Sequence, residues 1–311
     1  MISRREVLKG GLLLGGAAAI GTRASAGVIG EKGTARAGSV AFAHIKAGAS
    51  APCSVLHFSD THLTFVNPDE DPKLVEFGKK RTNTFGARQM EALKWSIGYA
   101  RMNSDMIVHT GDLIDFMSEG NLAALKETFA DAGGMFFGSA GNHEWQWRGE
   151  NSNLVSPESR AKCAKAYPFD VDFASRVLNG VNFVSIDDTL IDVKGQRGIT
   201  AEHMTRFENE VKKGLPIILC MHVPFRTPEI CMASRQFWRN RGRKFTAPDM
   251  RIVPFGKDTE DFIAYLKNVK LLKGILSGHQ HITFEERFSP TAMQYLVAGN
   301  YAFTARHVLI T

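Results

Sequence analysis

Short apolar runs alternate with amphipathic stretches along most of the chain. Apolar runs bounded by turn residues predict strands at 55–58, 106–108, 135–137, 215–221 and 271–276. Apolar residues that recur every three or four positions predict helices at 88–101, 122–129, 201–213 and 258–267. Asn179-Gly180 favours a tight hairpin, and residues 293–310 indicate two closing strands around Gly299-Asn300. This alternation of strands with helices predicts an α/β fold.

The first 26 residues have the layout of a secretory signal. Arg4-Arg5 precedes an apolar run rich in Gly and Ala at 10–21, and Ala24-Ser25-Ala26 provides a small-residue cleavage site. The arginine pair, followed by Leu8-Lys9, resembles a twin-arginine export signal. An uncleaved membrane anchor is the alternative, but the run is short and rich in small residues, whereas a span needs ~20 strongly apolar ones. We expect cleavage before Gly27, export by the twin-arginine machinery, and a periplasmic or extracellular protein.

Half of the formal net charge of the chain lies in this signal. Its four basic residues and one acidic residue carry +3 of the formal net charge of +6, so the remaining 285 residues of the 311 carry +3. This modest charge gives no reason to expect a stable nucleic-acid complex. The sequence leaves the oligomeric state open.

The remaining chain is long enough for one large α/β domain. Residues 27–50 are small and weakly patterned, so we expect a flexible lead-in there and the folded domain at 51–311. None of the four cysteines has zinc-finger spacing, and sequence alone does not choose between buried thiols and disulfides for Cys53, Cys163, Cys220 and Cys231.

Polar residues of the metal-binding type follow five of the predicted strands. In chain order they are Asp60-Thr61-His62, Gly111-Asp112, Gly141-Asn142-His143-Glu144, His222 and Gly278-His279-Gln280-His281. The carboxyl ends of parallel strands share one edge of a sheet, so these residues can converge. Side chains alternate along an extended segment, which would put Asp60 with His62, and His279 with His281, on one face. The strand ends therefore predict one shared site.

The seven candidate ligands form a mixed nitrogen and oxygen set: Asp60, Asp112, Asn142, His62, His222, His279 and His281. Such a set suits Zn, Mn or Fe better than the all-oxygen coordination of Ca or Mg. Seven ligands are too many for one ion, so two ions that share a carboxylate are the natural solution. Four histidines outside these motifs are given no role: His57, His109, His203 and His307.

The five motifs together resemble the calcineurin-like metallophosphoesterases. Their pattern D-x-H, G-D, G-N-H-E/D, H and G-H-x-H is present in full and in order between positions 60 and 281. The resemblance implies a four-layer α-β-β-α sandwich of two mixed sheets flanked by helices, with two divalent or mixed-valence metals at the strand ends. By position, it implies a first metal on Asp60, His62 and His281, a second on Asn142, His222 and His279, and Asp112 bridging both.

The resemblance also implies catalytic roles for His143 and Asp115. His143 would donate a proton to the leaving oxygen or stabilise charge on the phosphoryl group, and Asp115 would orient it, as an acid does in some branches. Two metals would lower the pKa of a bridging water towards ~7, so that hydroxide attacks phosphorus in line. Glu144 is expected to serve its loop. We therefore expect a metal-dependent phosphoric ester hydrolase that favours phosphodiesters over other phosphate esters.

Two alternatives stay open for the function. One is a broad phosphomonoesterase that scavenges phosphate. The other is a non-catalytic binding protein on the same fold, although the complete motif set disfavours it. Asp187-Asp188, which follows an apolar run, is interpreted as a turn acid and not as part of the site.

Two segments outside the motifs, 65–89 and 224–251, are candidates for choosing a small phosphorylated substrate. The second is a basic insertion in which Phe225, Phe237, Trp238 and Phe245 interleave with arginines. Arginines on phosphate and aromatics on a base would suit a nucleotide-like substrate, and the alternative is a solvated basic loop or one that meets anionic lipid or wall polymer.

Overall fold

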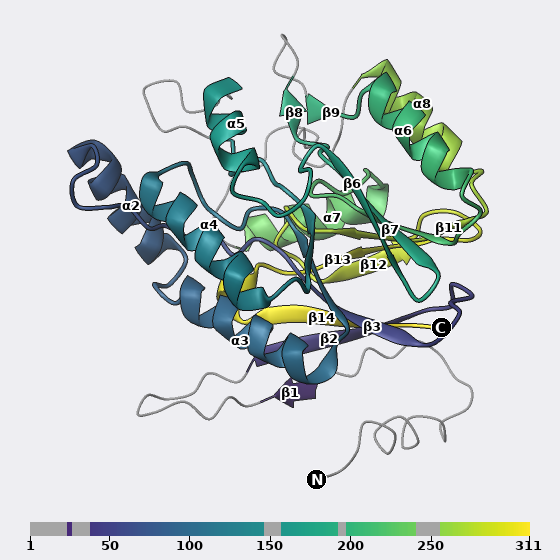
Figure 1. The fold of residues 1–311 in the computed structure, drawn as a ribbon, viewed down its shortest axis with the longest axis horizontal. Coiled ribbons are helices and arrows are strands. Elements are labelled where there is room, and N and C mark those ends of the chain that lie inside the picture. The colour runs from purple at the N-terminus through teal and green to yellow at the C-terminus, as the bar shows by residue number, and fades with distance from the viewer. Residues whose placement is uncertain (1–23, 27–37, 146–156, 192–196, 241–255) are drawn as a thin grey trace.

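Two six-stranded sheets form the centre of the protein in a computed structural model that describes residues 24–26, 38–145, 157–191, 197–240 and 256–311 (Figure 1). The first sheet has the order β1-β2-β14-β3-β4-β5. Its strands are β1 (Ala24–Ala26), β2 (Gly38–Ile45), β3 (Cys53–Phe58), β4 (Met106–Thr110), β5 (Phe136–Ser139) and β14 (Thr304–Ile310). β3, β4 and β5 run parallel, whereas β14 pairs with β3 in the antiparallel sense.

The second sheet is also mixed, with the order β12-β13-β11-β10-β7-β6. Its strands are β6 (Phe173–Leu178), β7 (Val181–Ile186), β10 (Ile217–Cys220), β11 (Leu272–Ser277), β12 (Phe284–Arg287) and β13 (Met293–Leu296). β7, β10, β11 and β13 run parallel, and the outer strands β6 and β12 are antiparallel to their neighbours. A separate small sheet joins β8 (Leu190–Ile191) to β9 (Arg197–Gly198).

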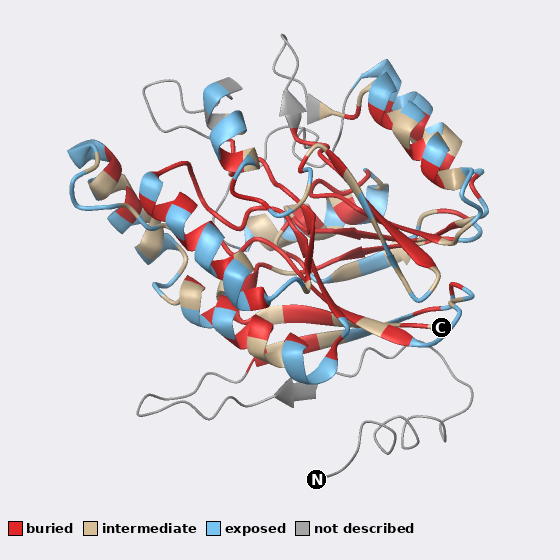
Figure 2. Cartoon of the chain, viewed as in Figure 1, coloured by how far each residue is buried: buried red, intermediate tan, exposed pale blue. Residues whose placement is uncertain are grey.

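Helices cover the outer face of each sheet, which confirms the predicted four-layer sandwich of two mixed sheets (Figure 1). α3 (Gln89–Asn103) and α4 (Glu119–Ala132) pack on the first sheet, and α6 (Ala201–Val211) and α8 (Lys257–Leu266) pack on the second. The inner faces of the two sheets share one apolar core, which contains Val55 and Val108 from the first sheet and Phe183 and Ile218 from the second. Figure 2 shows the resulting pattern of buried strands between helices with exposed outer faces.

Local sequence signals fix several of these elements. Asn179 and Gly180, with φ of 47° and 77°, form the two-residue turn between β6 and β7, as the tight-hairpin prediction requires. Ser118 caps α4 by accepting a hydrogen bond from the amide of Asn121 at 3.0 Å, and Gly133 ends that helix in the left-handed conformation.

Three further helices and one helical turn complete the described chain: α2 (Pro72–Thr84), α5 (Pro157–Ala164), α7 (Pro228–Arg239) and η1 (Asn300–Ala302). The sequence predictions missed α2 although its start is marked, because Asp71 accepts from the amide of Lys73 at 2.8 Å and Pro72 occupies the first turn. None of the described helices is long and apolar enough to cross a membrane.

The predicted flexible lead-in at 27–50 is wrong for residues 38–45. These residues form β2, which pairs with β14 along its whole length. Gly38 lies against the indole ring of Trp95, so the start of the strand is tied to α3. Residues 27–37, and all of the predicted signal except Ala24–Ala26 in β1, lie outside the described residues.

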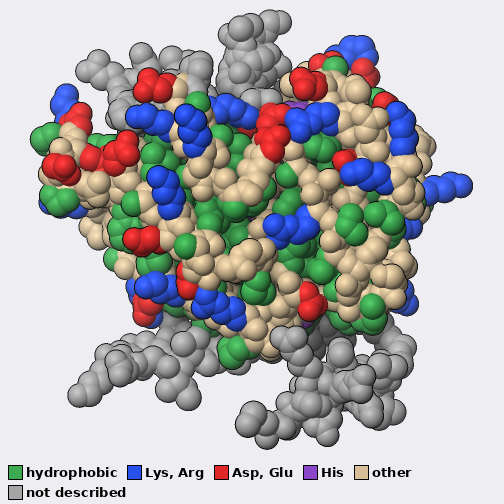
Figure 3. Space-filling view, in the orientation of Figure 1, with side chains coloured by type: hydrophobic (Ala, Val, Ile, Leu, Met, Phe, Trp, Pro, Cys, Tyr) green, Lys and Arg blue, Asp and Glu red, His purple; other side chains and the backbone are tan. Residues whose placement is uncertain are grey.

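The described cysteines are all free thiols, three of them buried: Cys53, Cys163 and Cys220. Burial raises the pKa of the Cys53 thiol to about 11. On the face shown in Figure 3, basic and acidic side chains are interspersed rather than gathered by sign.

Candidate metal centre

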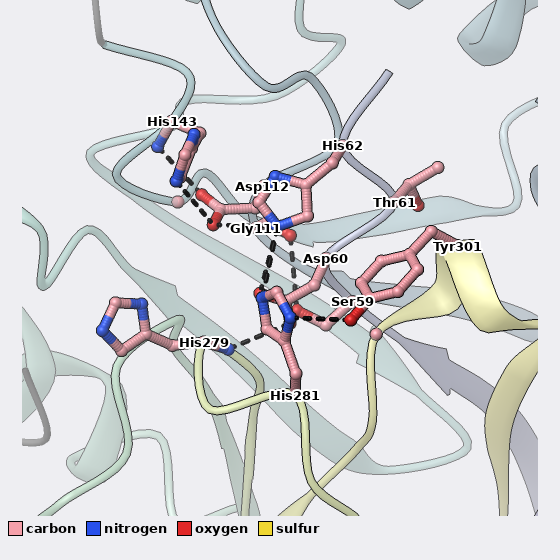
Figure 4. Close-up of polar contacts among 12 residues, drawn as sticks. Ser59, Asp60, Thr61, His62, Gly111, Asp112, His143, His279, His281 and Tyr301 are labelled. Carbon is pink, nitrogen blue, oxygen red and sulfur yellow. Dashed lines mark hydrogen bonds and ion pairs between the residues drawn. The ribbon is translucent and has the colours of Figure 1, made fainter. Parts of the chain in front are cut away.

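Five loops meet at one edge of the two sheets, and they carry all the predicted ligands. The loops follow β3, β4 and β5 of the first sheet and β10 and β11 of the second. The site is therefore built from two facing sheets, whereas the strand ends predicted a site at the edge of a single sheet. Figure 4 shows Asp60, His62, Asp112 and His281 turned toward one another.

Left-handed turns direct the ligand side chains into the site. Positive φ angles of 53–63° occur at Asp60, His62, Asp112, His279 and His281. Residues with a Cβ seldom adopt this conformation, and such strain gathers at functional sites. The amide of Asp60 donates to the carbonyl oxygen of Gly111, and the amide of His62 to that of Asp112, both at 2.9 Å. The expected extended backbone at the D-x-H and H-x-H motifs is therefore wrong, because turns and not strand alternation make these side chains converge.

Two motif glycines let the loops approach closely. A Cβ on Gly141 would overlap Oδ1 and the main-chain nitrogen of Asp112. A Cβ on Gly278 would overlap Oγ of Ser59 and lie 2.5 Å from Oδ2 of Asp60. Any larger residue at either position would push the ligand loops apart, which explains the glycine in both motifs.

The predicted ligand atoms gather in two groups, Asp60–His62–His281 and Asp112–His222–His279, and His143 forms a third group with His62 and Asp112. Within each group the atoms lie within 4.8 Å of one another. One oxygen lies between the first two groups. Oδ2 of Asp112 is 3.2 Å from Nε2 of His222 and 3.7 Å from Nε2 of His62. That is the placement expected of a carboxylate that bridges two metal ions.

Hydrogen bonds at the outer nitrogen orient the imidazoles of both groups. Nδ1 of His62 donates to Oδ1 of Asp115 at 2.9 Å, and Nδ1 of His222 donates to the main-chain oxygen of Thr110 at 2.6 Å. Each ring is therefore held with Nε2 facing the site, the nitrogen that could bind a metal ion.

The site-facing nitrogens lie close to other nitrogen and oxygen atoms. Nε2 of His62 lies 3.3 Å from Nε2 of His281, and Nε2 of His222 lies 3.2 Å from Nδ1 of His279. The buried Oδ1 of Asp60 accepts no hydrogen bond and lies 3.1 Å from His281 Nε2. A cation within each group would bind these atoms together, so the residues fit a centre of two metal ions. Asn142, the seventh predicted ligand, is buried in the loop after β5.

His143 lies beside the two groups and is held by Asp115. Its Nδ1 donates to the main-chain oxygen of Asp115 at 2.7 Å and is 3.1 Å from Oδ1 of the same residue. Its Nε2 lies 3.9 Å from Oδ2 of Asp112 and thus faces the site. Burial lowers the pKa of His143, but the carboxylates of Asp112 and Asp115 outweigh burial and raise the pKa to about 9. Asp115 contacts His143 as predicted, and it contacts His62 as well.

Glu144 holds the loops together, as expected for a residue outside the chemistry. Its fully buried carboxylate accepts from the amides of Gly141 at 2.8 Å, Asp112 at 3.0 Å and Leu113 at 2.6 Å. It also accepts from the hydroxyl of Tyr167 at 3.1 Å. Burial and the nearby charge of Asp112 raise the pKa of Glu144 to about 7.

Asp187-Asp188 serves a loop, in line with its interpretation as a turn acid. Asp188 accepts from the amides of His222 at 3.1 Å and Val223 at 2.9 Å, and Asp187 accepts from the amide of Thr189 at 2.8 Å. Asp188 thus fixes the backbone that carries a predicted ligand.

The sequence predictions missed Tyr301, and they placed Arg81, Phe85 and Trp238 only in segments that could choose the substrate, not at the metal centre. Phe85 stacks on the ring of His62 at 4.3 Å, and the hydroxyl of Tyr301 lies 3.0 Å from Nδ1 of His281. Only the position of Arg81 could have been inferred from the sequence. It follows the buried Leu74 and Gly78 of α2 by seven and three positions, which is the spacing of residues on one face of a helix.

The basic insertion at 224–251 is partly a helix and partly core, and residues 241–255 lie outside the described residues. Phe225 is buried against Phe288 and Phe262, so the expectation that it contacts a substrate base is wrong. Trp238, at the end of α7, lies 5.5 Å from the ring of His281. α7 is tied to the ligand loop by a hydrogen bond from Ser234 to Gln280.

A sequence profile described as calcineurin-like phosphoesterase matches residues 53–283, a span that includes all five motifs. The chain belongs to the calcineurin-like phosphoesterase family. As a member of this family it is a metal-dependent phosphoric ester hydrolase, and its clusters of Asp and His are those of a dinuclear metal site. The predicted family is therefore confirmed.

Several solved structures of phosphatases are similar to this calcineurin-like phosphoesterase. A dimetal phosphatase from Danio rerio is 13% identical over 80% of this chain and 88% of its own, with a TM-score of 0.48. The purple acid phosphatase PPD1 from yellow lupin is 16% identical over 86% of this chain and 48% of its own, with a TM-score of 0.47. A 5′-nucleotidase from Candida albicans is 13% identical over 80% and 45%, with a TM-score of 0.40. No curated protein is detectably similar in sequence to the chain.

Proposed function

We propose that this phosphoesterase is an exported enzyme that prefers phosphodiesters and uses Mn, Zn or Fe. In this proposal Asp60, His62 and His281 hold one ion, Asn142, His222 and His279 hold the other, and Asp112 bridges them. The observation that carries the assignment is the single Asp112 oxygen 3.7 Å from His62 and 3.2 Å from His222. The mixed nitrogen and oxygen ligands support the choice of metals.

His143 is proposed as the proton donor to the leaving oxygen. Two bound ions would supply a hydroxide nucleophile at neutral pH and neutralise charge on the phosphoryl oxygens. Nδ1 of His143 keeps its proton in the bond to the Asp115 carbonyl, so the proton that can be transferred is the one on Nε2, which faces the site. The Asp115 carboxylate, 3.1 Å from the same Nδ1, stabilises the positive ring before transfer.

The pairing of Arg81 with Asp115 supports a diester substrate. A phosphomonoester dianion needs more positive charge at its non-bridging oxygens than a diester monoanion does. The guanidinium of Arg81 reaches the site but is paired with Asp115 through two hydrogen bonds of 2.6 and 2.7 Å. The positive charge of Arg81 is therefore already paired with a protein carboxylate. This favours the diester monoanion over the monoester dianion.

Steady-state kinetics on two model substrates test this proposal. The mature protein is stripped of metal, reloaded with Mn, Zn or Fe, and assayed on bis(p-nitrophenyl) phosphate and p-nitrophenyl phosphate. We expect a kcat/KM at least tenfold higher for the diester. A tenfold preference for the monoester would replace the diester proposal by the broad phosphomonoesterase, and no hydrolysis of either ester with two metals bound would remove the enzymatic function.

Export is proposed from the N-terminal sequence alone. The arginine pair at 4–5 and the small residues at 24–26 support a twin-arginine signal. Mass spectrometry of the protein from the exported fraction should find Gly27 at the N-terminus, and replacing Arg4 and Arg5 by Lys should retain the chain inside the cell. An exported chain that still begins at Met1 would contradict cleavage.

A nucleotide-like substrate is the second part of the proposal on specificity. Its support is the indole of Trp238, which lies 5.5 Å from His281 and is half-buried at the site. Stacking on a base is worth about 1–3 kcal/mol, or roughly fivefold to 150-fold in affinity. Trp238→Ala should therefore raise KM for a dinucleotide by about tenfold and leave KM for an aliphatic diester unchanged. Equal effects on both substrates would refute a base contact.

A further inference from the structure

Asp115 is the point at which several side chains of the site are joined. Oδ1 of this fully buried carboxylate lies 2.9 Å from Nδ1 of His62 and 3.1 Å from Nδ1 of His143. The two histidines have different proposed tasks, since His62 binds metal and His143 faces the substrate. Oδ1 therefore orients His62 directly and acts on His143 together with the main-chain oxygen of Asp115, which accepts from the same Nδ1 at 2.7 Å. The carboxylate must be held in place for both rings to keep these contacts.

Arg81 from α2 fixes that carboxylate. Its Nε donates to Oδ2 of Asp115 at 2.6 Å, and its terminal nitrogen donates to Oδ1 at 2.7 Å. Two parallel hydrogen bonds from a planar guanidinium set both the position and the rotation of the carboxylate plane. The hydrogen bonds described for Arg81 go to Asp115 and not to either histidine ring, so its action on the rings passes through Asp115.

The packing of α2 against the loop after the D-x-H motif holds Arg81 in this place. Gly78, one turn before Arg81, is packed so closely that a Cβ would lie 2.8 Å from Cγ2 of Val66. Thr82 on the next position contacts the hydroxyl of Thr64 at 2.5 Å. Both contacts are with the loop that follows the D-x-H motif, so the helix and the ligand loop are one packed unit.

An aromatic ring completes the link. Phe85 contacts both Arg81 and His62: the guanidinium carbon is 4.8 Å from its ring centre, and the imidazole stacks on it at 4.3 Å with an interplanar angle of 9°. The cation–π contact and the stacking add to the hydrogen bonds by which Asp115 joins the guanidinium and the imidazole.

The geometry points to Arg81 as a positioning residue of the metal centre, which sets the Asp115 carboxylate and through it the orientation of both His62 and His143. This inference rests on the proposed function for the roles of the two histidines. It assigns a task to α2 that the five motifs do not contain. Without the guanidinium, the carboxylate would be free to rotate, so His62 would lose its acceptor and His143 would keep only its bond to the main-chain oxygen of Asp115.

The test compares Arg81→Ala and Arg81→Lys with Lys80→Ala, a change of the same charge at an exposed position of the same helix. In zinc-loaded protein, long-range proton–nitrogen NMR spectra of the imidazoles report which ring nitrogen carries the proton, independently of activity. We expect the Nδ1-protonated signals of His62 and His143 to be lost or split in Arg81→Ala, with kcat reduced about tenfold to 100-fold and KM within twofold. The kcat of Arg81→Lys should lie between those of the wild type and Arg81→Ala, because an ammonium group cannot make the two parallel hydrogen bonds of a guanidinium.

Rescue separates positioning from a general loss of folding. Guanidinium ion added to Arg81→Ala should recover part of kcat and restore both imidazole signals, and Lys80→Ala should match the wild type. Unchanged imidazole signals in Arg81→Ala would overturn the inference, as would a raised KM at unchanged kcat, which would make Arg81 a substrate contact. If the wild-type protein hydrolyses no ester, the proposed function fails, whereas the imidazole spectra still decide the inference.

Discussion

Replacing Glu144 by Gln tests how strongly a single buried carboxylate holds the ligand loops. Its two oxygens accept from the amides of Gly141, Asp112 and Leu113 and from the hydroxyl of Tyr167, at 2.6–3.1 Å. A glutamine keeps one acceptor oxygen and turns an NH2 group toward two of these donors. A buried donor left unsatisfied costs about 1–3 kcal/mol, so the expected loss of stability is about 3 kcal/mol.

Thermal unfolding of the metal-loaded protein measures this loss. For a domain of this size 1 kcal/mol corresponds to about 2–4 °C, so Tm should fall by about 6–12 °C. Wild type and variant must be compared at one metal concentration, because bound ions add their own stabilisation. The matched control is Glu127→Gln on the exposed face of α4, which should leave Tm unchanged. A Tm of Glu144→Gln within 2 °C of the wild type would refute the view that this carboxylate ties the loops together.

Three further predictions concern the metal centre. His143→Ala should lower kcat by about 10²–10⁴-fold while two metals remain bound, and metal loss on elemental analysis would show that His143 is a ligand instead. Gly141→Ala should lower both metal content and activity, because its Cβ overlaps Asp112, whereas Gly98→Ala in α3, with open space around it, should leave both intact. Removal of metal by dipicolinate should abolish hydrolysis, and titration with Mn, Zn or Fe should restore it at two equivalents per chain; restoration at one equivalent would contradict a dinuclear site.

Much of the fold was predictable because its signals are local. The apolar runs at 106–108 and 271–276 correspond to β4 and β11, and Asn179-Gly180 forms the predicted hairpin turn. β2 was missed because half-buried small residues in its sequence hide the alternation of a strand. α2 was missed because its polar sequence has only a narrow buried face, although Asp71-Pro72 marks its start.

The site was predictable as a set of residues but not as a geometry. The motifs identified which side chains gather, since strand ends meet at an edge. They did not predict the left-handed backbone at Asp60 and His62, because loops from other strands impose it. Nor did they predict Tyr301 beside His281 or Arg81 on Asp115, which are contacts between distant elements with no local periodicity of their own.

Anomalous diffraction from metal-loaded crystals decides whether the centre holds two metal ions. Data collected on both sides of the absorption edge of the loaded metal locate each bound ion independently of any assay. A dinuclear centre bridged by Asp112 should give two anomalous peaks per chain, one within the group of Asp60, His62 and His281 and one beside His222 and His279, with Oδ2 of Asp112 between them. A single peak, or two peaks that do not share Asp112, would rule out such a centre.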